Sequence, residues 1–166
     1  PASRYHPLSC FYASPECMEQ FFARLTWLSS KQVLDIEGLG ESGWRTLWQA
    51  HHFEHLFSWL LLTQAQMQAT PGFSSARGRA LWHRFNLVRE KPFIRWLMAL
   101  GVPLTQASLK AMGNVTWQTL SGHNVKNWQS LPGTGERKAR QIVAFIHDPG
   151  VAGLASWLGK QGLPGF

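Results

Sequence analysis

Apolar residues recur at helical spacing along most of this chain. Three such sets are Phe53, Leu56, Phe57 and Leu60; Phe93, Trp96, Leu97 and Leu100; and Ile142, Phe145 and Ile146. Residues spaced in this way lie on one face of an α-helix. No stretch alternates apolar and polar residues convincingly with the period of two that indicates a β-strand, and Val, Ile and Thr are sparse. The pattern therefore predicts an all-α protein.

Glycine-containing turns separate the predicted helices at nearly regular intervals. The first glycines of these turns are Gly38, Gly72, Gly101 and Gly133. One turn follows another after about thirty residues, a spacing that indicates tandem supersecondary units. Tetratricopeptide repeats have a similar period, but their pattern of Trp, Gly, Tyr and Ala is absent here. Glycines that open each helix fit a unit in which two helices flank a tight, phosphate-binding turn.

The fourth turn is the most informative about function. Residues 131–135 read Leu-Pro-Gly-Thr-Gly and precede an amphipathic segment that begins at Glu136. Two glycines two positions apart can expose successive backbone N–H groups, because no Cβ blocks the approach of a ligand. The helix that follows adds its unpaired N–H groups and the positive end of its dipole. This is the helix-hairpin-helix motif, which favours binding of a nucleic-acid backbone without regard to base sequence.

The other three turns keep this motif to different extents. The first has both glycines, Gly38 and Gly40, but its helix carries no cation before Arg45. The second has Ser74 in place of the second glycine. The third lacks that glycine, and Pro103 removes a backbone donor, so we expect it to be structural. The predicted DNA-phosphate contacts, strongest at the fourth turn, are Gly38 and Gly40; Gly72, Arg77 and Arg79; and Gly133, Thr134, Gly135, Arg137, Lys138 and Arg140.

The charge balance agrees with a nucleic-acid partner. Sixteen Lys and Arg against nine acids give a formal net charge of +7 and a pI near 10.0, which favours binding to an anion. The chain has no run of about twenty apolar residues and no basic amphipathic helix with a continuous apolar face, so we expect no membrane partner. With no signal peptide and only two cysteines, it fits a reducing, cytoplasmic compartment, in which a bacterial DNA-binding protein would associate with the nucleoid.

The domain organisation predicted from these patterns has two parts. Residues 1–27 form an irregular lead-in that begins without Met, and we interpret the chain as a fragment cut from a longer protein. Residues 28–166 form the DNA-binding domain, with four tandem helix-hairpin-helix repeats of which one or two are degenerate. Five of the nine tryptophans fall on apolar faces and are predicted mainly to pack in the core: Trp27, Trp44, Trp59, Trp96 and Trp157.

Two groups of residues resemble catalytic or metal sites without completing one. Cys10 and Cys17, with His6 nearby, form one loose pair, whereas a zinc site needs four ligands, usually in two close pairs. We therefore predict free thiols, with a relic of a zinc module as the alternative. Residues 51–55 read His-His-Phe-Glu-His and contain the H-x-x-E-H string of some zinc peptidases. They fall where a helix should end, where histidine is favourable on its own, so we predict no catalytic residue and no metal ligand here.

Three segments resemble the helix-hairpin-helix region of bacterial NAD-dependent DNA ligases. They are residues 28–40, which contain Leu-Asp-Ile-Glu-Gly-Leu-Gly; residues 93–102, which end in Ala-Leu-Gly-Val; and residues 131–145. Their order and spacing are similar to the family over residues 17–166, and Cys10 and Cys17 fall where the family has its second pair of zinc cysteines. The chain ends without a BRCT domain and its zinc module is incomplete, which resembles the short second form of the family, DNA ligase B.

This resemblance implies a function for the parent protein. Ligases of this family seal nicks in DNA repair and replication, through an enzyme-AMP and then a DNA-adenylate, using NAD and a divalent metal. The adenylated lysine, the nucleotidyltransferase domain and the OB domain lie upstream, so this fragment would be non-catalytic and would bind nicked duplex DNA beside them. Two other interpretations stay open. One is a helix-hairpin-helix module of a repair nuclease or junction-binding protein, and the other is a protein-interaction module that has lost DNA contact.

Overall fold

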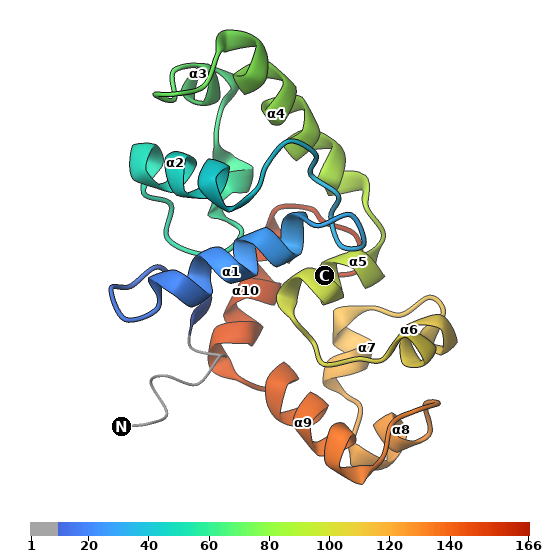
Figure 1. Ribbon diagram of the computed structural model, residues 1–166. Coiled ribbons are helices and arrows are strands. Elements are labelled where there is room, and N and C mark those ends of the chain that lie inside the picture. The colour runs from blue at the N-terminus through green and yellow to red at the C-terminus, as the bar shows by residue number, and fades with distance from the viewer. Residues whose placement is uncertain (1–9) are drawn as a thin grey trace. The chain divides into compact units, whose positions relative to one another are not determined.

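The part of the chain that the structure describes is mainly helical. The computed structural model describes residues 10–166, in which ten α-helices are found (Figure 1). Within these residues the β-structure consists of one isolated bridge, between Tyr12 and His55. The prediction of an all-α protein is therefore confirmed. Residues 1–9, which include His6 of the possible zinc module, lie outside the described residues.

The helices form two compact units, which divide between Lys91 and Pro92. Lys91 has an extended backbone (φ −65°, ψ 144°), the conformation that a following proline favours. The predicted DNA-binding domain, residues 28–166, thus contains part of the first unit and the whole of the second. Its predicted amino boundary falls within the helix Met18–Ser29.

The described part of the first unit includes four α-helices and the 3-10 helices η3 and η4. They are α1 (Met18–Ser29), α2 (Glu41–His51), η3 (Ser58–Leu61), α3 (Gln64–Gln68), α4 (Ser75–Leu87) and η4 (Val88–Glu90). Trp44 of α2 lies at the centre of the core, with its ring centroid 5.6 Å from that of Trp59 and 5.9 Å from that of Phe85. Its buried indole N–H donates to Oγ of Ser29 at 3.2 Å, which satisfies the polar atom of this large side chain.

The second unit contains six α-helices. They are α5 (Phe93–Leu100), α6 (Gln106–Met112), α7 (Trp117–Ser121), α8 (Val125–Gln129), α9 (Glu136–Ile146) and α10 (Pro149–Lys160). The core face of α9 consists of Ala139, Ile142, Phe145 and Ile146. The next helix, α10, begins where Asp148 accepts hydrogen bonds from the backbone N–H groups of Gly150 and Val151. Helical periodicity and local capping signals therefore account for this part of the fold.

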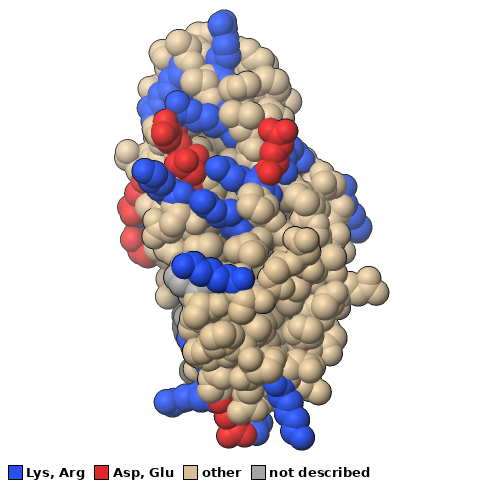
Figure 2. All heavy atoms as spheres, turned by 90° about the vertical axis from the view of Figure 1, so that its right-hand side faces the viewer, with Lys and Arg blue, Asp and Glu red and all other residues tan. Residues whose placement is uncertain are grey.

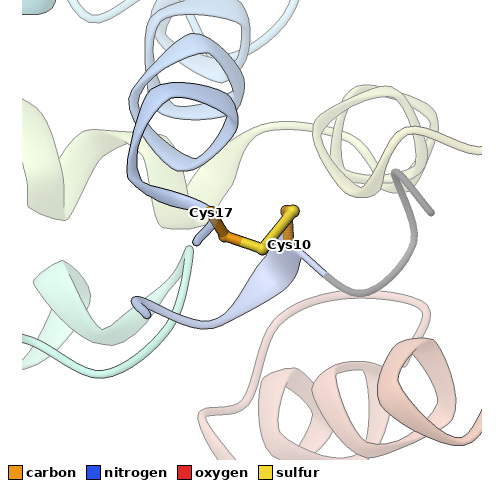
Figure 3. Close-up of a disulfide and its surroundings, with 2 residues drawn as sticks. All are labelled: Cys10 and Cys17. Carbon is orange, nitrogen blue, oxygen red and sulfur yellow. A yellow bond between two sulfur atoms is a disulfide. The ribbon is translucent and has the colours of Figure 1, made fainter. Parts of the chain in front are cut away.

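The two cysteines are paired, and the prediction of free thiols is wrong. Cys10 and Cys17 form a disulfide at a Cα–Cα distance of 5.3 Å, next to the start of α1 (Figure 3). The segment between them folds back on the first unit, because the N–H of Ala13 donates to the carbonyl oxygen of Glu54 at 2.8 Å. A turn in which Cys17 N–H donates to Ser14 then returns the chain toward Cys10. Spacing along the sequence does not reveal such a return.

Three of the five tryptophans predicted to pack do so completely. Trp44, Trp59 and Trp96 have no exposed surface. Trp157 is partly buried, and Trp27 instead exposes 42% of its surface. The buried face of α1 is formed by other residues, Phe21, Phe22, Leu25, Leu28 and Ser29.

Candidate nucleic-acid interface

Three of the four predicted turns have the same backbone geometry. Each begins with a glycine in the left-handed region, at φ 78° for Gly38, 90° for Gly72 and 76° for Gly133. Each ends, two residues later, with an extended residue that starts a helix: Gly40, Ser74 or Gly135. The leading position requires glycine, because an L side chain is strained at such positive φ. One type of turn therefore occurs before α2, α4 and α9.

The third predicted turn is different. Gly101 also has a positive φ, of 91°, but it ends α5 rather than opening the next helix. Residues 102–104 follow, and α6 begins only after Thr105, whose side chain caps it by accepting from the N–H of Ser108 at 3.0 Å. This turn therefore lacks the open helix start that the fourth turn has.

The second glycine of the first and fourth turns is not required by the fold. Gly40 and Gly135 have negative φ, and a Cβ built on either residue would meet no atom within 4 Å. Gly78 shows the contrast, since its Cβ would lie 2.6 Å from the carbonyl oxygen of Met67. Neither the backbone conformation nor internal packing therefore requires glycine at positions 40 and 135. Because glycine has no Cβ, it leaves the surface open to a ligand.

The same two helix starts have no side-chain cap. The N-cap residues of α2 and α9, Gly40 and Gly135, make no side-chain hydrogen bond to their helices, whereas Ser74 caps α4 by accepting from the N–H of Arg77 at 3.1 Å. The first N–H groups of an α-helix have no partner within the helix. At α2 and α9 these donors, with the positive end of the helix dipole, can therefore bind an anion such as a phosphate.

Cations accompany the start of α9. Arg137 and Arg140 are exposed and Lys138 is half-buried. Arg140 pairs with Glu136 at 3.0 Å. From Pro92 to Phe166 the chain has seven Lys and Arg against two acids, a formal charge of +5. The electrostatic field of this unit therefore favours an anionic partner.

The first turn has charges that are largely neutralised within the protein. Arg45 bonds Glu41 at 3.0 Å and Glu19 at 3.3 Å, and Arg84 lies 3.6 Å from Glu37. The hydrogen bond with Glu41 is the main cause of the raised pKa of Arg45. Residues 10–91 contain eight Lys and Arg against seven acids. Figure 2 shows acidic groups among the basic ones on this unit, at the level of α2 and α4.

The structure brings predicted contacts from the first two turns together. Nη2 of Arg77 donates to the carbonyl oxygen of Gly38 at 3.3 Å, and its guanidinium lies 4.1 Å from the centroid of the Phe73 ring. Arg79, on the same helix, is exposed and lines an open pocket with Gln64 and His83. Arg77 therefore joins the two turns, whereas Arg79 faces solvent.

The fourth turn is supported by two hydroxyl residues that sequence reasoning missed. Oγ of Ser108 donates to the carbonyl oxygen of Pro132 at 3.1 Å and lies 2.9 Å from Oγ1 of Thr134. Oγ1 of Thr105 lies 3.5 Å from the same carbonyl oxygen. The spacing of Thr105 and Ser108 is a helix-start signal, but that signal does not reveal which turn the hydroxyls contact.

The His-His-Phe-Glu-His string does not lie on one helix. His51 ends α2, and its Nε2 lies 2.8 Å from Oγ1 of Thr70. Nδ1 of His55 accepts from the backbone N–H of Phe57 at 3.1 Å. Burial lowers the pKa of both rings, that of His55 to about 4. Each histidine is thus engaged in a contact of its own within the first unit.

A metal-binding cluster and a single membrane-spanning helix are both absent from residues 10–166. These residues contain no group of three or more His, Cys, Asp or Glu placed to hold a metal ion. No single helix among them is long and apolar enough to cross a membrane, although α9 and α10 together pass that test as a pair bent by 62°. No protein-family model matches the sequence.

Proposed function

We propose that this chain binds the phosphate backbone of duplex DNA without sequence preference, through tandem helix-hairpin-helix repeats. The turns before α2, α4 and α9 and the modified turn before α6 are the four repeats of this proposal. The contacts are the glycines and cations predicted from the sequence, whereas the hydroxyl of Thr134, also predicted, is buried against Ser108. Backbone N–H groups of a helix start recognise phosphate oxygens, which are the same for every base pair.

One observation carries the proposal: the start of α9 has no side-chain cap, and its glycine is required neither by the backbone conformation nor by packing. Gly135 has an ordinary φ of −85° and free space where its Cβ would be. A capping Ser, Asp or Asn there would stabilise the helix, yet the position has glycine. A phosphate oxygen that approaches the first N–H groups of α9 gives this glycine a purpose, and Arg137 and Lys138 place positive charge beside it.

The repeats are expected to contribute unequally. The turn before α9 combines an open helix start with a unit of formal charge +5. The turn before α2 has the same open start, but acids bind the nearby Arg45 and Arg84. The turn before α4 has a side-chain cap, so its contribution comes mainly from Arg79. We therefore assign the main phosphate contact to the fourth turn.

In the proposed parent enzyme, an NAD-dependent DNA ligase, this region acts by orientation. Sealing a nick requires that a 3′-hydroxyl stay in line with an activated 5′-phosphate. Repeats that bind the backbones on both sides of the nick hold the duplex while an upstream nucleotidyltransferase domain, with NAD and a divalent metal, supplies the chemistry.

Salt-dependent binding of a plain duplex tests the proposal. If the chain neutralises about four phosphates, the logarithm of its affinity should fall against the logarithm of salt concentration with a slope of roughly −3 to −4. Two duplexes of unrelated sequence should bind equally well. A flat salt response would contradict the proposal and favour a protein-interaction module. A Lys-x-Asp-Gly string upstream in the full gene would distinguish a ligase from a repair nuclease.

A further inference from the structure

We propose that Ser108 is a positioning residue for the fourth turn. Its buried hydroxyl holds the backbone of residues 132–134 in the conformation that presents the start of α9 to a phosphate, without contacting DNA itself. This inference rests on the function proposed above. It gives the start of α6, whose own turn was expected to be only structural, a specific role in binding.

The hydrogen bonds of Ser108 secure the turn on both sides of Gly133. A serine hydroxyl has one proton to donate and lone pairs that accept. Ser108 donates to the carbonyl oxygen of Pro132 at 3.1 Å, so the contact of 2.9 Å with Thr134 is a bond in which the threonine donates. The residues before and after the left-handed glycine are thus tied to one buried atom.

Burial makes these bonds difficult to replace. Ser108 has no exposed surface, and Thr134 exposes only 7%. Water cannot easily take over when one partner is lost, and an unsatisfied buried polar group is costly. Thr105 adds rigidity, because its hydroxyl lies 2.8 Å from Oγ of Ser108 and accepts from the backbone N–H of the same residue.

The first unit contains a similar contact, made to the leading glycine of a turn rather than to the residue before it. Ser108 is the third residue of α6, and Arg77 is the third residue of α4. Arg77 donates to the carbonyl oxygen of Gly38, as Ser108 donates to that of Pro132. In each unit, therefore, a side chain in the first turn of one helix donates to a backbone carbonyl group in the turn that precedes another helix, α2 in the first unit and α9 in the second. Recurrence in two units with different side chains argues for a positioning role.

Two variants of the 166-residue chain remove the central bond from opposite sides. Ser108→Ala removes one hydroxyl, and Thr134→Val removes the other while it preserves the shape of the side chain. Each should weaken duplex binding about three- to ten-fold, the range for loss of one net hydrogen bond. The salt slope should stay unchanged, since no cation is lost, whereas Arg137→Ala should reduce it by about 0.9. The double variant should be little weaker than Ser108→Ala alone, because Ser108→Ala already removes the bond with Thr134 together with the bond to Pro132.

Thr119→Ala is the matched control. Thr119 is the third residue of α7, and its hydroxyl lies 3.1 Å from that of the cap Thr116, but no hydrogen bond joins it to a turn before α9. This variant should bind duplex DNA as the wild type does. Folded Ser108→Ala or Thr134→Val that binds no more weakly than Thr119→Ala overturns the inference, as does a changed salt slope. If Ser108→Ala does not fold, Thr134→Val decides alone. A wild-type chain that binds no duplex refutes the proposed function instead.

Discussion

Nη2 of Arg77 donates a hydrogen bond to the carbonyl oxygen of Gly38 at 3.3 Å, across 39 positions of sequence. The sequence places both residues among the DNA contacts but in separate turns. In the structure the arginine joins the start of α4 to the turn before α2, and it also stacks on Phe73. A guanidinium has five donors, so a phosphate contact at the remaining donors is compatible with this bond.

Gly135→Asp should separate DNA binding from stability. A Cβ at this position meets no atom within 4 Å, and Asp is a favourable cap near the positive end of the helix dipole, so the free energy of unfolding should rise by a few tenths to about 1 kcal/mol. Duplex binding should nevertheless fall by at least about ten-fold, because a carboxylate replaces the phosphate at the start of α9. Chemical denaturation and a binding titration measure the two effects.

The control for this variant is Gly153→Ala, at an exposed position inside α10 where a Cβ also meets no atom. It should stabilise the protein by about 0.5–1 kcal/mol and leave DNA binding unchanged. Equal binding by Gly135→Asp and the wild type would show that no phosphate approaches Gly135.

Arg137→Ala should weaken duplex binding more than Lys110→Ala does. Arg137 is exposed in the first turn of α9, so its charge-assisted contact should contribute about 1 kcal/mol, below the range of 1.5–3 kcal/mol for desolvated bonds. Lys110 is exposed near the end of α6, away from an open helix start. Titrations at one fixed salt concentration compare them. Equal losses would mean that binding depends on net charge and not on the turn.

Reduction should destabilise the first unit. The disulfide joins residues seven positions apart. It should stabilise the folded state by about 2 kcal/mol, because closing this short loop lowers the conformational entropy of the unfolded chain. Calorimetry should therefore show a lower melting temperature in dithiothreitol. The double variant Cys10→Ser, Cys17→Ser should melt like the reduced protein and should not respond to dithiothreitol. A wild-type melting curve that ignores the reductant would mean that the bond does not form.

Stability should decrease as the pH falls from about 6.5 to about 4. Burial lowers the pKa of His55 to about 4, so the unfolded chain takes up a proton in this range before the native state does. The contribution of His55 to the free energy of unfolding is complete at pH values above the pKa of the unfolded chain, and it is lost as the pH falls toward 4. It should be on the order of 2 kcal/mol, after allowance for partial solvation of the ring. Denaturation at several pH values measures it.

His55→Asn supplies the comparison. The amide oxygen can accept the N–H of Phe57 in place of Nδ1, and it does not titrate. The pH dependence should become shallower and retain only the part due to groups such as His51, whose pKa burial also lowers. An unchanged pH profile would assign the effect to other residues.

Local signals in the sequence indicated the all-α fold and the leading glycines of the turns, but not every helix. The prediction that Phe53, Leu56, Phe57 and Leu60 share a face of an α-helix is wrong, because these residues lie in a loop, in a turn and in the 3-10 helix η3. Gly38, Gly72, Gly101 and Gly133 were selected from their spacing, and all four adopt positive φ. The length of the third turn, by contrast, was not evident, since Pro103 indicates a break but not that α6 starts only at Gln106. The division at Lys91 was also missed, because helical periodicity continues on both sides of it.

The sequence by itself determined the all-α architecture and the positions of the turns, because helical periodicity, glycine conformation and capping depend on residues a few positions apart. Only the tertiary structure decided which partners those residues take. Ser108 meets Thr134, Arg77 meets Gly38, and Cys10 pairs with Cys17. Such pairs form when helices pack and the chain folds back on itself, and many other pairings would satisfy the same local pattern.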